Sequence, residues 1–251
     1  MVKINNQVMN TGKLHDRHVG GTIVLVGNAA SLNDVDLSKI GSIPTIGCNR
    51  ILRHPTFRPT YLMVADRRPY ASEMTDGTYR RHARTTKMLF STTIYDPKIS
   101  CYDTPAEPLP TFPWYPWRVG VSSTPANWTT FRRPLCSFAS ITGPMLQAAV
   151  IMGATKIGIV GVDMQAPDSG DSIHFYKNEG AWEGYKTLPG VRPGGSIIAD
   201  KTLSLYKQAV AWLFSHGVVV ANLNPRPNTV FSRAFGRTDF EEFCSANQPQ
   251  A

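Results

Sequence analysis

The chain has 251 residues, of which 42% are hydrophobic and 10% aromatic, and it carries a net charge of +8. These values are typical of a globular protein with one large domain and a substantial core. No apolar run approaches the roughly 20 residues of a membrane-spanning helix, and residues 1–10 lack the apolar segment of a signal peptide. We therefore expect a cytoplasmic protein with no membrane span.

The positive charge favours polyanionic ligands, namely nucleotides, nucleic acids or anionic glycans. The basic residues nevertheless look dispersed, with only short groups such as Arg67-Arg68, Arg80-Arg81 and Arg132-Arg133, and no known nucleic-acid-binding motif occurs. A basic surface without a specific partner explains the charge equally well. The four cysteines are widely spaced without a Cys-x-x-Cys pair, so we expect reduced thiols and no zinc site.

Residues 1–20 are polar without a regular period and are expected to form an N-terminal arm. The next stretch, 22–27, is an apolar run that leads through Gly27 to Asn28, as in a strand buried on both faces. Gly27 permits backbone angles closed to other residues, and Ser31 is among the polar residues that can cap a following helix. Sheets of α/β proteins bind phosphate at such a turn. A Gly-Asn turn is also common without any ligand, and the dinucleotide and P-loop motifs are absent.

Three further apolar runs predict strands at 45–49, 61–66 and 87–91. The first of these runs ends on Asn49 and the second on Asp66. Because the carboxyl ends of parallel strands meet at one crevice, Asn28, Asn49 and Asp66 are expected to converge there. The amides of Asn28 and Asn49 suit hydrogen bonds to a ribose, a base edge or a phosphate without repelling an anion.

The composition changes between residues 95 and 135, where six prolines fall from Pro97 to Pro116. Prolines at this density disfavour helices and central strands. The same stretch contains several large aromatic residues, namely Trp114, Tyr115, Trp117 and Trp128. We expect an irregular insertion that covers the crevice as a lid or as an acceptor platform. A surface loop that packs its own tryptophans explains the pattern equally well.

Regular structure returns after residue 140. Helical spacing of apolar residues predicts a helix over 142–153, with Thr142 or Gly143 as its N-cap and Pro144 in its first position. This helix start would add backbone donors and a partial positive charge to the crevice. The elements that follow are a strand ending on Asp163, an amphipathic helix and a last strand, at 156–163, 198–215 and 218–223.

Alternating strands and helices predict an α/β protein with a Rossmann-like, mostly parallel sheet and helices on both faces. The nucleotide-binding catalytic domain is expected at 21–235, and residues 236–251 form a polar C-terminal tail. A homo-oligomer is compatible with this organisation.

Four side chains are candidates for chemistry. His174 lies in a polar loop after the strand that ends on Asp163, and an imidazole can take a proton from an attacking hydroxyl. Tyr176 could donate to a leaving phosphate, although a structural histidine and a packed tyrosine are the plainer interpretations. Asp66 and Asp163 are the one carboxylate pair at strand ends, so a metal is permitted but not demanded.

The ordered set of these segments resembles a family, the bacterial lipo-oligosaccharide sialyltransferases. The matching segments are Val26-Gly27-Asn28-Ala29-Ala30-Ser31-Leu32, Cys48-Asn49, Ile141-Thr142-Gly143 and the run from Gly153 to Asp163. They correspond to a Gly-Asn-Gly-Pro-Ser-Leu loop, a Cys-Asn pair, a Ser-Gly helix start and a Gly-Ile-Asp-Phe-Tyr strand end. The chain also resembles the related 6-hydroxymethylpterin diphosphokinase (MptE-like) family, which shares the first loop, the Gly-x-Asp strand end and a histidine soon after it. The similarity covers roughly 22–66 and 138–176.

The resemblance implies that Asn28, Asn49, Thr142 and Gly143 hold the nucleotide of an activated donor and that Asp163 is the strand-end acid. The chain departs from the sialyltransferases in two places: Ala29-Ala30 replaces Gly-Pro, and Met164-Gln165 replaces the Phe-Tyr whose tyrosine assists the leaving phosphate. The position of His174 suits the pterin-kinase branch better. Sialic acid as the donor sugar is therefore not implied.

The leading hypothesis is a glycosyltransferase that moves a sugar from a nucleotide-activated donor to a hydroxyl of a glycan or other anionic acceptor, DNA included. His174 and Asp163 are its catalytic candidates, and no cofactor is required. The donor-binding candidates are Gly27, Asn28, Ser31, Asn49, Asp66, Thr142, Gly143 and Tyr176. One alternative is a Mg-ATP-dependent pyrophosphokinase, in which Asp66 and Asp163 hold the metal. The other is a non-catalytic protein that binds nucleic acid or has a structural role.

Overall fold

The computed structural model describes residues 8–96, 101–105, 110–120, 125, 128–138, 140–165, 173–176 and 200–249. Its main sheet has eight strands in the order β10-β9-β1-β2-β3-β4-β5, and β6 also pairs with β4. The strands of this sheet are β1 (Thr22–Val26), β2 (Thr45–Cys48), β3 (Tyr61–Asp66), β4 (Lys87–Asp96), β5 (Cys101–Pro105), β6 (Trp114–Trp117), β9 (Lys156–Val160) and β10 (Val219–Asn222). Two short strands, β7 (Val119–Gly120) and β8 (Leu135–Cys136), form a separate pair.

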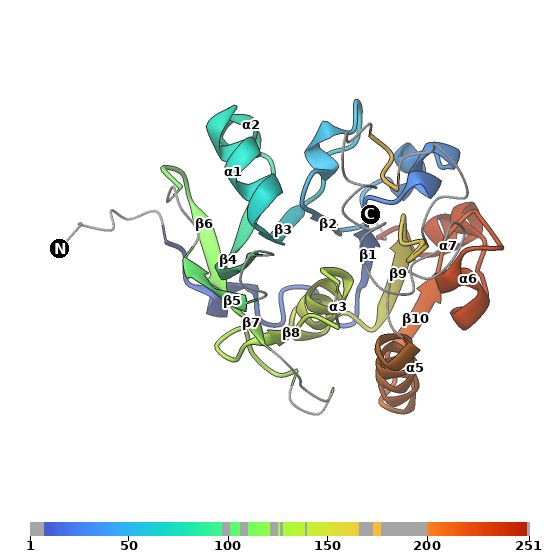
Figure 1. The fold of residues 1–251 in the computed structure, drawn as a ribbon. Coiled ribbons are helices and arrows are strands. Elements are labelled where there is room, and N and C mark those ends of the chain that lie inside the picture. The colour runs from blue at the N-terminus through green and yellow to red at the C-terminus, as the bar shows by residue number, and fades with distance from the viewer. Residues whose placement is uncertain are drawn as a thin grey trace.

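The helices of the described residues are α1 (Arg67–Thr75), α2 (Thr78–His82), α3 (Thr142–Ile151), α5 (Asp200–Ser215), α6 (Val230–Phe235) and α7 (Phe240–Ala246). Short 3₁₀ helices cover Thr11–Leu14, Ala30–Asp34, Leu37–Ile40 and Ile51–Arg53. In Figure 1, α3 and α5 lie on one side of the sheet, and α1, α2 and α7 lie on the other. None of the described helices is long and apolar enough to span a membrane.

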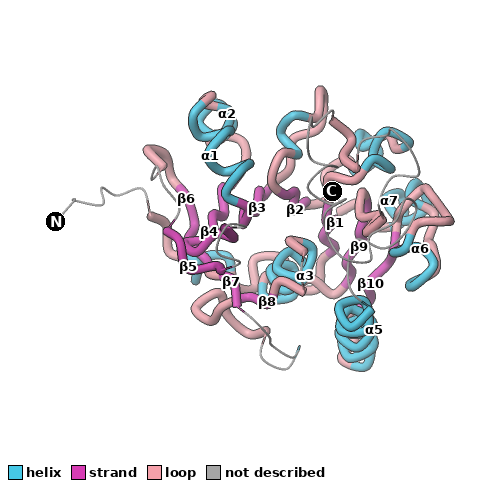
Figure 2. The backbone as a smooth tube through the Cα atoms, in the orientation of Figure 1, coloured by secondary structure: helices cyan, strands magenta, loops and turns pink. Residues whose placement is uncertain are grey.

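The sheet confirms the expected α/β class. Every pair in it is parallel except β4 with β5. The chain starts in the middle at β1, moves outward through β2, β3 and β4, and then returns to place β9 and β10 on the opposite side of β1. The direction of winding therefore reverses between β1 and β9, the position at which open α/β sheets form a ligand crevice. Figure 2 shows these strands as the central layer between the helices.

Both faces of the sheet are buried, as the continuous apolar strands predict. One core joins alternate strand residues such as Ile23 and Leu25 to α3 and α5, and the other joins Val24 and Val26 to the 3₁₀ helices and α7. The six strands and the two long helices expected from the apolar patterns are all present, with small differences at their ends. The helices α1 and α2 were not expected, because their sequence is polar and rich in arginine.

Gly27 was expected to adopt backbone angles that are closed to other residues, but the structure requires glycine there because another loop lies too close for a side chain. Its φ is not positive; the left-handed residue is Gly161, with φ of 68°. A Cβ at Gly27 would lie 2.1 Å from the carbonyl oxygen of Gly161. The loops after β1 and β9 therefore touch through their backbones, and a side chain at Gly27 would push them apart.

The aromatic stretch differs from the expected lid. Residues 114–117 form β6, which pairs parallel with β4, so Pro116 lies in a strand at the margin of the sheet, where a missing N–H is tolerated. The side chains of Trp114, Tyr115, Trp117 and Trp128 are buried in the two cores. Trp117, which is 2% exposed, also donates its indole N–H to the Leu89 carbonyl at 3.1 Å. These rings therefore stabilise the sheet and cannot stack on an acceptor.

Both ends of the chain are more ordered than the polar composition predicts. Val8 pairs with Trp114, and Leu14 is buried in the core, so the arm is packed from residue 8 onward. In the tail, α7 packs on the sheet, and Gln248 accepts from the Ser42 N–H at 3.2 Å and donates to the Ile40 carbonyl at 3.0 Å. On the amphipathic helix α5, Leu213 is buried, whereas the next residue, Phe214, is 71% exposed.

Candidate functional site

The predicted strand-end residues do come together at the carboxyl edge of the sheet. Asn28 follows β1 and donates its side-chain N–H to the carbonyl of Cys48, the last residue of β2, at 3.1 Å. Asn49 comes next in the chain and donates its backbone N–H to Met63 of β3 at 3.0 Å. Asp66 ends β3, the neighbour of β2 in the sheet. The three residues thus follow or end adjacent strands at the same edge of the sheet.

Asp163 joins the three loops on the other side of this edge. One oxygen of its buried carboxylate accepts from the Asn224 side chain at 2.6 Å, and the other accepts from the Ser31 backbone N–H at 3.2 Å. Ser31 was expected to cap a helix, but the helix here is a five-residue 3₁₀ turn with Ala29 as N-cap. The backbone N–H of Ser31, which could have faced a phosphate, donates instead to the carboxylate of Asp163. This geometry gives Asp163 a positioning role, because both of its oxygens already accept hydrogen bonds.

The buried polar atoms without a hydrogen-bond partner among the described residues include three at this edge, namely Asn28 Oδ1, Ser31 Oγ and Asn49 Oδ1. A buried polar group without a partner costs about 1–3 kcal/mol. Asn49 also adopts φ of 45°, a left-handed conformation that is uncommon outside glycine. Such clustered costs are typical of a site at which a ligand supplies the missing partners.

The segment 173–176 lies against the loop that follows β1 and carries His174, a catalytic candidate, and Tyr176, a donor-binding candidate. His174 forms an antiparallel bridge with Ala29, and the Phe175 N–H donates to the Asn28 carbonyl at 3.0 Å. The ring of His174 stacks on Tyr176 with centroids 5.0 Å apart. Both side chains therefore lie beside the loop at the carboxyl end of β1.

The electrostatic environment keeps His174 neutral. Burial and, to a smaller extent, the charge of Arg50 lower the pKa of its imidazole to about 4, and a hydrogen bond with the Asn28 backbone opposes the shift. Burial also raises the pKa of the Tyr176 phenol. Near neutral pH the pair therefore consists of a neutral imidazole beside a protonated phenol.

A cluster around Glu73 was not predicted from the sequence. Glu73 is 1% exposed, and its Oε1 accepts from Arg53 Nη2 at 2.6 Å and lies 3.4 Å from Arg50 Nε. Arg50 also donates to Ser72 Oγ at 3.3 Å, and the Arg53 guanidinium lies 5.8 Å from the centre of the Tyr176 ring. Glu73 thus fixes two cations beside the strand ends. The sequence contained one sign of this cluster, because Arg50 directly follows Asn49. The carboxylate that binds Arg50 belongs to Glu73 on helix α1, which was not expected.

The start of α3 lies at the same edge, since α3 runs antiparallel to β9, which follows it. Its N-cap is Ile141, and neither Thr142 nor Gly143 caps the helix as predicted. The Thr142 N–H donates to Ser140 Oγ at 3.2 Å, and the Gly143 N–H donates to the Ser140 carbonyl at 3.2 Å. A Cβ at Gly143 would lie 2.7 Å from the Cys136 carbonyl oxygen. A ligand can accept hydrogen bonds from the N–H groups of Thr142 and Gly143 only if it replaces their present hydrogen bonds to Ser140.

Asp66 acts first as a helix cap. Its side chain accepts from the Arg68 N–H at 2.9 Å at the start of α1. Burial raises its pKa, and the Arg68 N–H and the positive charges of Arg68 and Arg50 oppose that shift. Among the described residues no three His, Cys, Asp or Glu side chains gather as they would around a metal ion.

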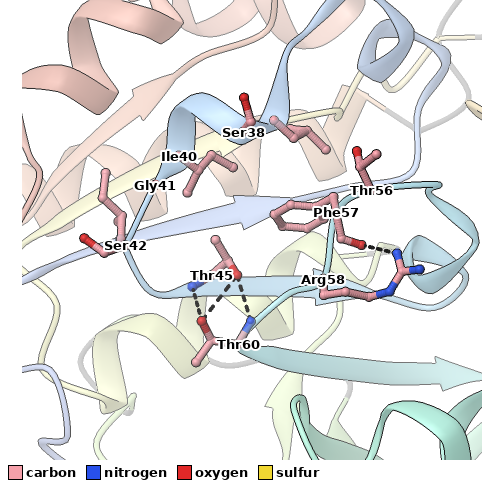
Figure 3. Close-up of a pocket in the computed structure, with 11 residues that line it drawn as sticks. Ser38, Ile40, Gly41, Ser42, Thr45, Thr56, Phe57, Arg58 and Thr60 are labelled. Atoms are coloured by element: carbon pink, nitrogen blue, oxygen red, sulfur yellow. Dashed lines mark hydrogen bonds between the residues drawn. The ribbon is translucent and has the colours of Figure 1, made fainter.

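A cavity of about 400 Å³ lies at the other edge of the sheet, where the strands begin. Figure 3 shows Thr45 and Thr60 below it, with Ile40 and the Phe57 ring above them. Thr45 is the first residue of β2, and Thr60 directly precedes β3. The cavity contains no residue predicted for the site, so it is separate from the strand-end crevice.

The chain matches no protein-family model and no curated protein sequence. Its fold is similar to solved structures of the sialyltransferase CstII. The enzyme from Campylobacter jejuni in complex with the substrate analogue CMP-3FNeuAc superposes with a TM-score of 0.51 at 10% identity, covering 92% of this chain and 89% of that chain. A variant of CstII in complex with CMP gives a TM-score of 0.51 at 12% identity, with the same coverage. The likeness establishes a sialyltransferase-like fold.

Proposed function

We propose that the protein is a glycosyltransferase that takes a sugar from a nucleotide-activated donor. The observation that supports this most directly is the group of unpaired buried atoms on Asn28, Ser31 and Asn49 at the topological switch point of the sheet. Uncharged acceptors in that position suit the hydroxyls of a ribose or the amino group of a base. The sialyltransferase-like fold is consistent with the proposal.

In the proposed reaction His174 is the general base. The acceptor hydroxyl oxygen attacks the anomeric carbon of the donor sugar, and its proton passes to a ring nitrogen of His174. The bond between the anomeric carbon and the phosphate oxygen breaks, and its electron pair leaves with the nucleotide. Burial lowers the pKa of His174, so its imidazole enters this step in the neutral form. Asp163 holds the β1 loop in place for this step.

Arg50 and Tyr176 are proposed to stabilise the leaving nucleotide. This chain has Met164-Gln165 where the sialyltransferases carry the tyrosine that assists the leaving phosphate, so another donor is needed. Arg50 Nε lies 3.4 Å from Glu73 Oε1, and the positive charge of Arg50 helps to lower the pKa of His174. A guanidinium and a phenol O–H can together bind the negative charge that develops on the phosphate. A metal ion is not needed for this chemistry.

The test is the melting temperature in the presence of CMP, CDP, UDP and GDP, of their sugar conjugates, and of ATP with and without magnesium. A ligand that binds the native state raises the melting temperature. We expect a shift with one nucleotide and its sugar conjugate in the presence of EDTA, and loss of that shift in Asn49→Gly. A shift with Mg-ATP alone would instead indicate the pyrophosphokinase. No shift with any nucleotide would contradict the proposal and favour a non-catalytic protein.

A further inference from the structure

The positive charge of the protein is concentrated in one region. Residues 50–87 contain eight arginines and one lysine but only three acidic residues, so six of the eight net positive charges fall there. In the sequence these residues look dispersed, because the basic groups are separated by strand β3 and by polar stretches. The fold places them on α1, α2 and the segments beside these helices, at one end of the upper layer in Figure 1.

The acidic residues of this region offset only part of its positive charge. Glu73 is buried under Arg50 and Arg53. The other two, Asp66 and Asp76, accept hydrogen bonds from backbone N–H groups at the starts of α1 and α2. The arginines that remain exposed are Arg53, Arg58, Arg67, Arg68, Arg80, Arg81 and Arg84.

The helices that carry these arginines form a firm support. The ring of Tyr70 on α1 lies 6.4 Å from the ring of Tyr79 on α2, and the Tyr79 hydroxyl donates to the Pro69 carbonyl at 3.3 Å. The positive charges also affect one another. Burial lowers the pKa of His82 at the end of α2, and Arg58 and Arg81 lower it further. The cations from the β2–β3 loop and from α2 therefore form one electrostatic surface.

Helix stability does not explain this pattern. Arg67 and Arg68 occupy the first turn of α1, which has no acidic residue. The helix dipole is positive at that end, so a cation there is unfavourable where an acidic residue would stabilise the helix. The basic residues are also arginine in all positions but one. Arginine binds phosphate through a planar fork, which lysine cannot do.

We propose that this arginine surface, the exposed side chains of α1, α2 and the β2–β3 loop, binds the phosphate backbone of a nucleic acid that carries the acceptor hydroxyl. The acceptor role rests on the proposed function, whereas binding itself does not. The surface begins at Asp66, where β3 reaches the strand-end crevice, so a bound strand would lie next to His174 and Arg50. A phosphodiester backbone has the charge density that so many arginines would match.

The test compares two double variants of equal charge. Arg68→Gln with Arg84→Gln neutralises two exposed residues of the arginine surface, and Arg132→Gln with Arg133→Gln neutralises two exposed residues elsewhere. Binding of a fluorescent DNA duplex is followed by anisotropy between about 50 and 200 mM salt, a range over which an affinity that depends on phosphate contacts falls strongly. Polysialic acid at equal charge concentration serves as the acidic-glycan probe.

We expect the Arg68/Arg84 variant to bind the duplex about tenfold more weakly, with a salt slope shallower by about one unit for each phosphate that is no longer neutralised. The Arg132/Arg133 variant should bind like the parent protein. Equal behaviour of the two variants would overturn the assignment to this surface. Tighter binding of polysialic acid than of DNA, abolished in the Arg68/Arg84 variant, would show that the partner is an acidic glycan.

The nucleotide-induced shift in melting temperature is measured on the same proteins. If DNA binding fails while the shift persists, the nucleic-acid inference is wrong and the proposed glycosyl transfer stands. If the duplex binds as expected but no nucleotide shifts the melting temperature, the arginine surface binds nucleic acid without the proposed transferase activity.

Discussion

The polar residues at the two edges of the central sheet differ in whether their hydrogen bonds are satisfied. At the edge where strands begin, Thr45 and Thr60 satisfy each other: the Thr45 N–H donates to Thr60 Oγ1 at 3.1 Å, and the Thr60 N–H donates to Thr45 Oγ1 at 2.9 Å. At the edge where strands end, Asn28 Oδ1 and Asn49 Oδ1 are buried without partners in the described structure. The open cavity lies at the first edge, but the unsatisfied atoms lie at the second.

Among the described residues, open volume and unmet hydrogen bonds therefore indicate different edges. Groups that already bond one another have little left to offer a ligand. Buried acceptors without partners gain free energy when a ligand supplies the donors. The difference between the two edges can be tested by changing each of them.

The largest expected effect is on turnover when the base is removed. His174→Gln should lower the rate of sugar transfer by about 10²–10⁴-fold, which is the usual contribution of a general base. The control is His216→Gln, since His216 stacks on Trp212 at the end of α5, away from the carboxyl edge. Initial rates at saturating donor would decide, and a His174 variant with the turnover of the parent would remove the base assignment.

Next in size is the loss of the carboxylate that joins the loops of the carboxyl edge. Asp163→Ala leaves the Ser31 N–H and the Asn224 side chain without their acceptor. Hydrogen bonds to a charged group contribute about 1.5–3 kcal/mol each, so we expect unfolding to become easier by about 3 kcal/mol or more. Urea denaturation measures this change. Asp163→Asn keeps one acceptor oxygen and should lose less, and equal losses would contradict the positioning role.

A pH dependence of stability should follow from His174. Its pKa is about 4 in the folded protein, below the ordinary value of 6.5, because it is buried. Below pH 6.5 the unfolded chain takes up a proton that the folded site refuses, so this contribution to stability is present above pH 6.5 and is lost as the pH falls toward 4. Denaturation of the parent and of His174→Gln between these values measures it. Parallel curves for the two proteins would show that His174 is not buried as described.

Most of the fold could be predicted because apolar runs and helical spacing are local signals. They identified β1, β2, β3, β9, α3 and α5. The strand-end rule also placed Asn28, Asn49 and Asp66 at one edge. Other features depended on partners that are distant in the sequence. The role of Gly27 is set by Gly161, and Trp117 is buried because residues 114–117 join the sheet.

The Glu73 cluster escaped prediction for a related reason. Its two arginines and its carboxylate lie on separate elements, and nothing in the spacing of Arg50 and Glu73 indicates that they meet. Proline density likewise misled the interpretation of 95–135, because a strand at the margin of a sheet tolerates a proline that a central strand does not. Local sequence patterns therefore predicted the position of the crevice, but not the charged side chains of Arg50, Arg53 and Glu73 beside it.

The smallest expected effects are the changes in stability of one variant at each edge, and they distinguish the two edges most clearly. Thr45→Val removes an acceptor from the Thr60 N–H and should destabilise the protein by about 1–2 kcal/mol, with no change in nucleotide binding. Asn49→Gly removes an unpaired oxygen and suits the positive φ, so its stability should change by less than about 0.5 kcal/mol. The same variant should lose the nucleotide-induced shift in melting temperature. If Asn49→Gly instead destabilised the protein as much as Thr45→Val and left the shift unchanged, the unpaired oxygen would be structural, and the crevice would lose its strongest support as a ligand site.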